Sequence, residues 1–554
     1  MNYEKLAELL FPHIDKTPAD YEAMYPARDL PAGAKVTRLG PSPTGFIHLG
    51  NLYGAFVDER LAHQSGGKFF LRIEDTDDKR YVEGAVEIII NSLRFFGIQF
   101  DEGATMNGDI GDYGDYTQSH RGPIYQCFAK KLVAEGKAYP CFMTEEDIAE
   151  IHAQQEAQKA NPGIYGKWAK SRDLSMEEIE AKLAAGTPYV IRLKSDGDMS
   201  LPEDQIKRFQ VEDAIRGTLD MPVNDQDTVL LKATGIPTYH FAHVVDDHLM
   251  RTTHVVRGAE WLPSLPIHVE LFEKLGWEVP IYCHTAQLMK MDGGSKRKLS
   301  KRKDPELALS YYYQQGIPVP SVMEYLMTLL NSNFEEWRRA NQTAPLDDFP
   351  FSTKKMSVSG SLFDMDKLHD VSKNVISRMS AEDVYDSVAK WSADNDPEFH
   401  ALFVRDPEMT KQFLAIGRGG KKPRKDLALW SETKAYMDFM FDELFQPDYS
   451  GMPERAKADA KAILTEYQDV YDAQDEMTVW FDKVKALAER HGFAPETKLY
   501  KKNPEQYKGP VGDISMVLRV AICGRTNAPD LYSVMQLMPT EKIKARLAAA
   551  CEAL

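Results

Sequence analysis

The sequence predicts an α/β protein in which a parallel sheet carries an inserted domain and is followed by an all-helical C-terminal half. Three observations predict this class. Residues 36–74 alternate strand, helix and strand patterns, residues 121–227 interrupt the alternation, and residues 304–554 keep a helical periodicity. With 554 residues the chain exceeds what one hydrophobic core supports, so we expect several domains.

The first element is a strand–helix–strand unit. Residues 36–38 form a strand pattern, residues 51–64 a helical pattern that stops at Gly66 and Gly67, and residues 69–74 a second strand pattern. Two strands connected through a helix pair in parallel, because the helix returns the chain to the same end of the sheet. We therefore expect a parallel sheet to start here.

The strand–helix alternation resumes after the interruption. A strand is expected at residues 229–232, a helix at 239–248 and another strand at 254–257. The resulting parts are an N-terminal helical extension (1–32), the first half of the sheet domain (33–120), a connective insertion (121–227), the second half of the sheet domain (228–303), a connecting region (304–370) and a helical region (371–554).

Composition excludes several classes of protein. The 43% hydrophobic and 27% charged residues are typical of an ordinary globular protein. The first ten residues lack the basic and apolar runs of a signal peptide, and no apolar stretch is long enough to span a membrane. The five cysteines are scattered along the chain, and their spacing fits neither a disulfide framework nor a metal-binding motif. We expect a cytoplasmic protein.

Charge is distributed unevenly along the chain. The net charge of −17 argues against general affinity for nucleic acid, because phosphate binding needs local cation density. Two basic clusters supply such density, at residues 296–303 and 418–425. Either cluster could be an ordinary solvated loop, but an acidic chain with two confined basic patches can also bind RNA in one orientation.

Two loops are typical of phosphate chemistry. Residues 38–51 run through a Gly/Pro-rich loop from a strand into a helix, which presents backbone N–H groups and a helix N-terminus to an anion. Residues 298–302 form a cationic loop that could close over that anion. We expect the glycines at 293 and 294 to act as its hinge.

Three charged residues stand where predicted parallel strands end, namely Arg38, Glu74 and Arg257. Ligands bind open α/β sheets beyond these ends. Two cations and one anion would suit a ligand with two carboxylates and one ammonium, such as glutamate. Each residue alone could instead be an ordinary salt-bridge partner.

These segments resemble class I aminoacyl-tRNA synthetases, and in particular the bacterial glutamyl-tRNA synthetases. The resemblance is carried by residues 38–45, 71–77, 237–242, 244–250 and 257–262, by Lys298-Leu-Ser-Lys301-Arg302 and by the helical tail around 518–535. It implies a Rossmann-like sheet domain, an acceptor-binding insertion, a stem-contact region at 304–370 and a helical anticodon-binding region at 371–554.

The resemblance also implies site residues. The glutamate-binding residues would be Arg38, Ser42, Glu74, Tyr239, His243 and Arg257, where His243 replaces a frequent Asn. His48, Lys298 and Lys301 would be catalytic. ATP would contact Pro41, Thr44, Gly45, His48, Gly50, Asn51, Glu260, Trp261, Lys298, Ser300 and Lys301, where Asn51 replaces the last His of the family's HIGH-type signature.

The implied reaction is ATP-dependent activation of L-glutamate to glutamyl-adenylate and transfer to the 3′-terminal adenosine of tRNA(Glu), with ATP entering together with Mg²⁺. We expect a monomer that contacts tRNA through Lys421, Lys422 and Arg424. The alternatives are a glutaminyl-tRNA synthetase, an enzyme that also charges tRNA(Gln), and a catalytically silent tRNA-binding relative. The helical tail argues against the first, because the glutaminyl enzymes end in a β-barrel.

The sequence argues against two possible metal sites. His240, His243, Asp246, Asp247 and His248 could form a cluster, but their spacing does not place the acids and histidines on one helix face. Some glutamyl enzymes bind zinc through a Cys-x-Cys pair that here would start at Cys141. Its other positions hold Met143, Tyr165 and Trp168, so we expect no structural zinc.

Overall fold

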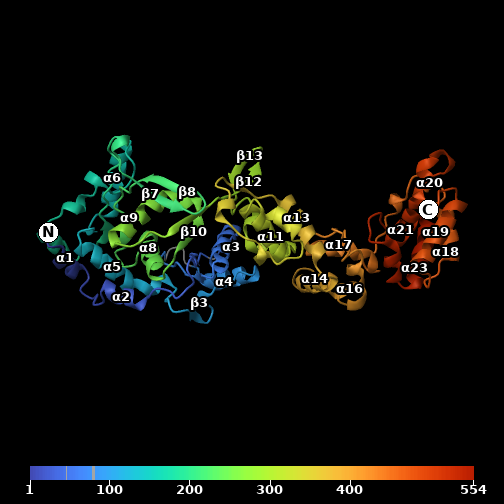
Figure 1. Ribbon diagram of the computed structural model, residues 1–554, viewed down its shortest axis with the longest axis horizontal. Helices are drawn as coiled ribbons and strands as arrows, with labels where there is room; N and C mark the ends of the chain where they lie inside the picture. Colours follow the sequence, from blue (N-terminus) through green and yellow to red (C-terminus); the bar gives the residue numbers. More distant parts are fainter. Residues whose placement is uncertain (45, 78–81) are drawn as a thin grey trace. The chain divides into compact units, whose positions relative to one another are not determined.

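The computed structural model describes residues 1–44, 46–77 and 82–554. The chain folds as two compact units, which we treat separately (Figure 1). The N-terminal unit comprises Met1–Tyr311 and Leu326–Asp364, and the helical unit comprises Tyr312–Tyr325 and Met365–Leu554. None of the described helices is both long and apolar enough to cross a bilayer.

The predicted strand–helix–strand unit is confirmed. β1 (Val36–Leu39) and β2 (Lys68–Leu71) pair in parallel and are connected by α3 (Leu49–Gln64). β2 continues in parallel to β3 (Glu102–Thr105). All four residues of β1 are buried, because helices cover the sheet and strands of a covered parallel sheet are apolar on both faces.

A second pair of parallel strands lies beside β1. β10 (His254–Gly258) and β11 (Ile281–Thr285) pair in parallel around α9 (Leu265–Leu275). The backbone N–H of Thr253 donates to the Val36 carbonyl at 3.0 Å, which places β10 next to β1. The carboxyl ends of β1, β2 and β10 therefore meet at one edge, and the expected Rossmann-like arrangement is confirmed.

The insertion has its own antiparallel sheet of β5 (Ala138–Cys141), β6 (Val190–Leu193) and β9 (Val229–Leu231). The pattern at β9 predicts the first strand of the resuming parallel sheet, and that prediction is wrong. A short apolar run specifies a strand but not its partner, which the tertiary structure selects. Conversely β7 (Arg208–Asp213), inside the insertion by sequence, pairs with β11.

The remaining helices and strands of the N-terminal unit surround these sheets. They are α1 (Tyr3–Leu10), α2 (Pro18–Met24), α4 (Ala85–Phe95), β4 (Gly108–Ile110), α5 (Gly122–Ala134), α6 (Glu145–Ala157), α7 (Met176–Ala184), β8 (Gly217–Pro222), α8 (Tyr239–Leu249), β12 (Leu288–Asp292), β13 (Ser295–Lys298), α10 (Leu309–Gln315), α11 (Val319–Leu330), α12 (Phe334–Ala340) and β14 (Ser361–Leu362), with α10 and α11 extending into the helical unit.

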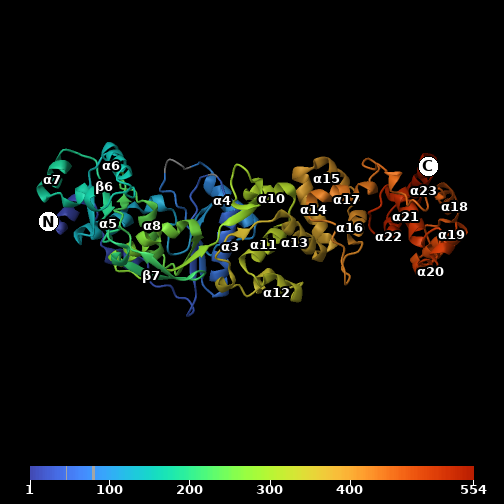
Figure 2. The same ribbon diagram turned by 90° about the horizontal axis from the view of Figure 1, so that it is seen from above.

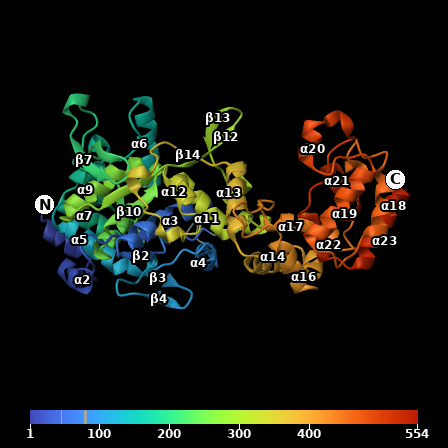
Figure 3. The ribbon, with the colours of Figure 1, turned by 45° about the vertical axis from the view of Figure 1, so that its right-hand side comes forward.

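Gly293 and Gly294 form a tight hairpin turn rather than the expected open hinge. They connect β12 to β13 with φ values of 57° and 88°. A two-residue turn with both residues at positive φ is the geometry that matches the twist of a β-hairpin, and glycine adopts it without strain. The cationic loop therefore starts from a regular hairpin (Figure 3).

The N-terminal extension is an integral part of its unit. α1 and α2 lie beside α5 (Figure 1), and Leu6, Leu10 and Tyr21 are buried in the same apolar core as Phe128 of α5. Arg28, which follows α2, donates both terminal nitrogens to Glu102 at 2.8 and 3.0 Å. The extension is thus tied to β3 of the central sheet.

We expect Arg28→Ala to lower the free energy of unfolding by about 2 kcal/mol, because it removes a largely buried, charge-assisted bidentate contact. Urea denaturation measures the loss. Lys5→Ala is the matched control, since the Lys5–Glu180 pair is exposed and such pairs contribute below about 1 kcal/mol. If Arg28→Ala and Lys5→Ala lowered the free energy of unfolding equally, Arg28 would not anchor the extension.

Helices alone build the helical unit. Its first group contains α14 to α17 (Figure 2) and its second α18 to α23 (Figure 3). The helices are α13 (Met365–Arg378), α14 (Ala381–Asn395), α15 (Pro397–Phe403), α16 (Pro407–Ala415), α17 (Thr433–Met437), α18 (Ala460–Val470), α19 (Met477–Arg490), α20 (Thr497–Lys502), α21 (Val511–Cys523), α22 (Leu531–Gln536) and α23 (Thr540–Ala553). This confirms a largely helical C-terminal half; the exception within residues 304–554 is β14, which pairs with β12.

Candidate active site

His48 caps the helix that leaves the Gly/Pro-rich loop. Its Nδ1 accepts a hydrogen bond from the Asn51 backbone N–H at 3.3 Å, and the Asn51 side chain accepts from the His48 N–H at 3.0 Å. This reciprocal capping satisfies two backbone donors at the start of α3. Asn51, which replaces a histidine of the family signature, therefore has a structural role here.

The cap determines the tautomer of His48. Because Nδ1 accepts a hydrogen bond, the ring proton sits on Nε2 and is available as a donor. Burial, together with the nearby charges of Lys301 and Lys298, lowers the pKa of His48 to about 4. Gly50 lies close to the ring, and a Cβ there would approach it at 3.0 Å. His48 is therefore a neutral hydrogen-bond donor at neutral pH.

The remaining predicted residues of the ATP and glutamate sites differ in how exposed they are. Pro41 is buried, Thr44 is half-buried, and Gly45 lies outside the described residues. Ser42 is exposed, as are Glu260 and Trp261 in the 3₁₀ turn after β10.

The cationic loop is anchored at its base and free at its tip. Asp304 accepts the Ser300 backbone N–H at 2.8 Å and both terminal nitrogens of Arg297 at 2.6 and 2.8 Å. The hydrogen bonds from Arg297 hold the pKa of Asp304 below its usual range. Lys298 and Lys301 are exposed and pair with no carboxylate in the described chain.

Lys301 already lies over the Gly/Pro-rich loop. Its Nζ sits 4.0 Å from the centre of the Phe46 ring, two residues before His48. A cation over an aromatic face is attracted by the ring quadrupole. The two loops that were predicted to share one anion are thus neighbours in this structure.

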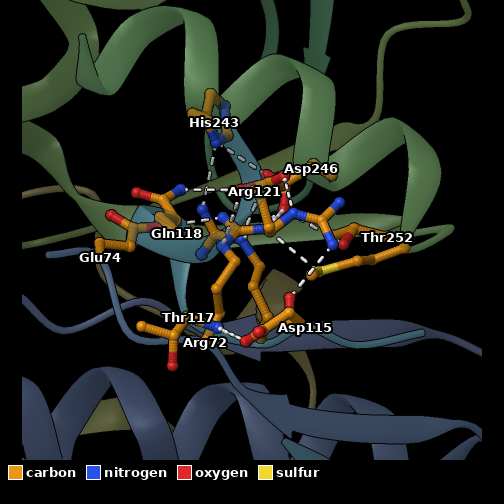
Figure 4. Close-up of polar contacts among 12 residues, drawn as sticks. Arg72, Glu74, Asp115, Thr117, Gln118, Arg121, His243, Asp246 and Thr252 are labelled. Atoms are coloured by element: carbon orange, nitrogen blue, oxygen red, sulfur yellow. Dashed lines mark hydrogen bonds and ion pairs between the residues drawn. The ribbon is translucent and has the colours of Figure 1, made fainter. Parts of the chain in front are cut away.

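Charged side chains from β1, from the segment that follows β2 and from α8 meet in a buried network (Figure 4). Asp247 of α8 accepts from Nε of Arg38 at 3.1 Å and from Nη1 of Arg72 at 2.7 Å. Arg72 donates its Nη2 to Glu74 at 2.9 Å. Arg72 is 0% exposed and Asp247 1% exposed. Each buried charge is therefore stable only because an opposite charge lies beside it.

The two carboxyl groups respond differently to burial. Burial alone would raise the pKa of Asp247, but the flanking guanidiniums of Arg38 and Arg72 hold it well below its usual range. Burial raises the pKa of Glu74, and the same two arginines only partly offset that effect. Arg38 and Glu74 therefore do have the salt-bridge partners that were the alternative interpretation of each residue.

The neighbouring Asp246 lies 3.9 Å from Arg72 Nε and has further partners of its own. It accepts from Arg121 Nε at 2.7 Å, Tyr125 Oη at 2.8 Å and Gln118 Nε2 at 2.9 Å (Figure 4). Arg72, Arg121, Gln118 and Tyr125 were absent from the site predictions. Arg72 lies within a motif that carried the family resemblance, and the others have no local signal.

The residues of the alternative metal cluster on α8 have other partners. Asp246 and Asp247 bind arginines, His248 pairs with Glu22 at 2.6 Å, and His240 pairs with His268 at 2.9 Å. The described residues contain no group of three or more His, Cys, Asp or Glu side chains arranged for a metal.

Met143 and Tyr165 pack around the small apolar cluster that contains Trp168, where zinc ligands would fall. The absence of structural zinc stays a prediction.

Arg257 has a different environment from the other arginines. Its Nε donates to Nε2 of His284 and its Nη1 to Nδ1 of His268, both at 2.9 Å. Its Nη2 is buried and has no hydrogen-bond partner among the described residues. Buried donors are nearly always paired, so a free one at a strand end points to a ligand.

Tyr239 and His243 share one helix face, as their spacing predicts. Their rings stack at a centroid distance of 5.8 Å, and the centroid of the Trp261 ring lies 4.6 Å from that of Tyr239. Nδ1 of His243 pairs with Asp247 at 2.7 Å, and its Nε2 lies 3.2 Å from Tyr282 Oη. Burial lowers the pKa of His243 to about 3, so it is a neutral member of the charged network.

Acid is expected to destabilise the N-terminal unit. Unfolded histidines bind a proton near pH 6.5, whereas burial lowers the pKa of folded His48, His240 and His254 to about 4. The unfolded state therefore binds more protons between about pH 6.5 and 4, and stability is lost as the pH falls through that range. Calorimetry should show a falling Tm, with a shallower decrease for His254→Gln. If the Tm of His254→Gln fell with pH as steeply as that of the wild type, His254 would not be buried in its neutral form.

The second basic cluster lies in the helical unit. Arg424 is engaged in a bidentate pair with Asp426 at 2.6 and 2.8 Å, and Arg418 donates to the carbonyls of Leu414 and Ile376 at 2.6 Å. Lys421 and Lys422 are exposed. Only part of the predicted cluster is therefore free for an external anion.

Comparison with known proteins agrees with this geometry. Residues 35–370 match the model of class I tRNA synthetases (E and Q), catalytic domain, and residues 424–551 match an anticodon binding domain. A glutamate–tRNA ligase of Acetivibrio thermocellus is 56% identical over 548 residues, which are 99% of each chain. The chain belongs to the glutamate–tRNA ligases.

Further relatives support the assignment. A ligase of Sorangium cellulosum is 44% identical, covering 96% of this chain and 97% of its own length. A crystal structure of a glutamate tRNA ligase from Elizabethkingia meningosepticum, in complex with its amino acid, has a TM-score of 0.74 at 28% identity, covering 94% and 99% of the two chains. The ligase is thus an ATP-dependent class I aminoacyl-tRNA synthetase of the glutamyl branch.

Proposed function

We propose that the ligase binds L-glutamate at the edge formed by β1, β2 and β10. The observation that carries this proposal is the charge of the pocket. Arg38 and Arg72 pair with Asp247 and Glu74, whereas Arg257 donates to two uncharged imidazole nitrogens, lies over the Tyr282 ring and pairs with no carboxylate among the described residues. The pocket therefore keeps one uncompensated positive charge, which matches the net negative charge of glutamate.

The side-chain atoms that face the pocket indicate how each residue would bind glutamate. Nη2 of Arg257 is an unpaired donor for one substrate carboxylate. Glu74 supplies the negative partner for the substrate ammonium. Arg38, with Tyr239 and the neutral His243 beside it, faces the other carboxylate, and Ser42 completes the pocket from the exposed loop.

Activation needs positioning and charge stabilisation rather than an enzyme nucleophile. The substrate α-carboxylate attacks the α-phosphorus of ATP, the bond to the β-phosphate oxygen breaks, and pyrophosphate leaves. We propose that Nε2–H of His48, Lys298 and Lys301 stabilise the negative charge on these phosphates. The terminal ribose hydroxyl of tRNA then attacks the acyl carbon and releases AMP.

The remaining ATP contacts fit the same loops. Pro41, Thr44, Gly50 and Asn51 lie on or next to the loop capped by His48, Ser300 lies in the anchored cationic loop, and Glu260 and Trp261 lie after β10. We place Gly45 here by sequence alone. Magnesium would enter bound to the ATP phosphates, the usual mode for an ion that keeps most of its water ligands.

ATP–pyrophosphate exchange tests this proposal. Exchange should depend on glutamate, measured with and without tRNA, and should be far slower with glutamine. No exchange with glutamate under either condition would overturn the proposal. Charging of purified tRNA(Glu) and tRNA(Gln) side by side then decides whether the ligase accepts one tRNA or both.

We further propose that the insertion contacts the acceptor end of tRNA, residues 304–370 its stem and residues 371–554 its anticodon region. The match of residues 424–551 to an anticodon binding domain supports the last assignment. A monomer and a cytoplasmic location remain predictions, which sedimentation and cell fractionation test.

Lys421 and Lys422 are proposed to bind the tRNA backbone. The double change Lys421→Ala/Lys422→Ala should weaken tRNA binding and reduce the slope of log K against log salt by about 0.7 to 0.9 for each phosphate that is no longer neutralised. Filter binding at several salt concentrations measures both. Lys5→Ala/Lys16→Ala, exposed in the N-terminal extension and outside the proposed tRNA-contacting regions, is the control. Unchanged binding by the first variant would make this loop ordinary solvated surface.

A further inference from the structure

We propose that His268 and His284 are positioning residues that make the ligase select a carboxylate over an amide. They hold Arg257 through uncharged nitrogens, so that its positive charge is left for the substrate. This inference rests on the proposed role of Arg257 in glutamate binding, and it takes the side-chain carboxylate as the group that Arg257 binds, because the α-carboxylate is common to glutamate and glutamine. It assigns the discrimination against glutamine to residues that do not touch the substrate.

The hydrogen bonds around Arg257 have only one consistent direction. A guanidinium has donors but no acceptor, so Nε2 of His284 and Nδ1 of His268 must both accept. Each ring therefore carries its proton on its other nitrogen. A doubly protonated ring at either position would face Arg257 with a second positive charge and no lone pair.

An outer set of partners maintains these tautomers. Nδ1–H of His284 donates to the Asp213 carboxylate at 2.7 Å, and Nε2–H of His268 donates to Nδ1 of His240 at 2.9 Å. His268 and His284 are both 0% exposed and Asp213 is 2% exposed. Burial and the charge of Arg257 lower the pKa of both histidines.

Among the described residues, no carboxylate forms an ion pair with Arg257. Asp247 pairs with Arg38 and Arg72, and Asp213 is separated from Arg257 by the His284 ring. A buried guanidinium held by neutral groups gains much from an incoming carboxylate and little from a neutral amide. A carboxylate in place of either histidine would satisfy that charge within the protein and remove the preference.

Two changes at one position separate charge from hydrogen bonding. His268→Gln keeps a neutral acceptor and should leave the KM for glutamate within a few-fold of the wild-type value. His268→Glu places a carboxylate beside Arg257 and should raise the KM for glutamate about 100-fold, with the KM for ATP unchanged. It should also narrow the ratio of kcat/KM for glutamate over glutamine by at least about tenfold.

His268→Leu provides a second comparison if the buried glutamate prevents folding. It removes the acceptor without adding charge, and should raise the KM for glutamate while His268→Gln does not. His152→Gln and His152→Glu, at an exposed position of α6, are matched controls. Calorimetric Tm values report folding for every variant.

The assay is glutamate- and glutamine-dependent ATP–pyrophosphate exchange in the presence of tRNA. Equal KM values for glutamate in His268→Gln and His268→Glu, or an unchanged glutamate-to-glutamine ratio in His268→Glu, would overturn the inference. If His268→Glu does not fold, equal KM values in His268→Gln and His268→Leu would overturn it. Failure of the wild-type ligase to exchange with glutamate would instead contradict the proposed function, before any variant is compared.

Discussion

Replacement of Lys301 by alanine is expected to lower kcat for ATP–pyrophosphate exchange about 100- to 1,000-fold, the usual cost of removing one group aimed at developing charge. Lys301 is exposed and has no ion-pair partner in the described chain, and its Nζ lies over Phe46 beside the loop capped by His48. Its charge is therefore available for a phosphate. Loss of such an interaction affects the transition state more than substrate binding.

Lys303→Ala is the control for this experiment. Lys303 is also exposed and lies on the same loop, but its backbone N–H bonds to the Ser300 carbonyl at the anchored base. It should change kcat less than about threefold, because solvated charges beyond the first contact are screened. Equal losses in both variants would mean that the loop acts through its total charge and not through Lys301.

The second large effect is expected for Asp247→Asn, which should lower the free energy of unfolding by about 3 to 5 kcal/mol. The change leaves the guanidiniums of Arg38 and Arg72 buried with one carboxylate fewer. Removing one partner of a buried charge pair costs more than the pair itself contributes. Urea denaturation measures the loss, and the KM for glutamate should rise as Arg38 shifts.

Asp220→Asn is the matched control, because the Asp220–Arg208 pair is exposed and should contribute less than about 1 kcal/mol. The stabilisation that Asp247 contributes also depends on pH. Its folded pKa is lowered, so its stabilisation is fully present above the unfolded value of about 3.9 and is lost as the pH falls below it. A loss for Asp247→Asn no larger than that of the control would contradict the buried network.

The position of each catalytic loop could be predicted from local sequence. Glycines and prolines after a strand, followed by a helical pattern, specify a turn into α3, and His48 with Asn51 completes its cap. The direction of those hydrogen bonds could not be predicted, because it depends on which atoms approach in three dimensions. Yet that direction is what makes Nε2 of His48 the donor.

Partners far apart in sequence were beyond prediction for the same reason. Arg38, Glu74 and Arg257 were found because each follows a recognisable strand pattern. Arg72 and Asp247 pair with the first two; they lie in segments that carry the family resemblance, but nothing in those segments says with which residue each pairs. His268 and His284, which hold the third, lie outside those segments. Their contacts form only when α8, α9 and β11 pack beside β1 and β10.

By itself the sequence determined the fold class, the glutamyl family, the two phosphate loops and the charged residues at the strand ends. These depend on local periodicity and on short motifs. Only the tertiary structure decided that β9 pairs within the insertion, that Arg38 is already balanced and that Arg257 is not. The physical reason is that a charge's effect depends on what lies within a few ångströms of it, and folding alone brings those neighbours together.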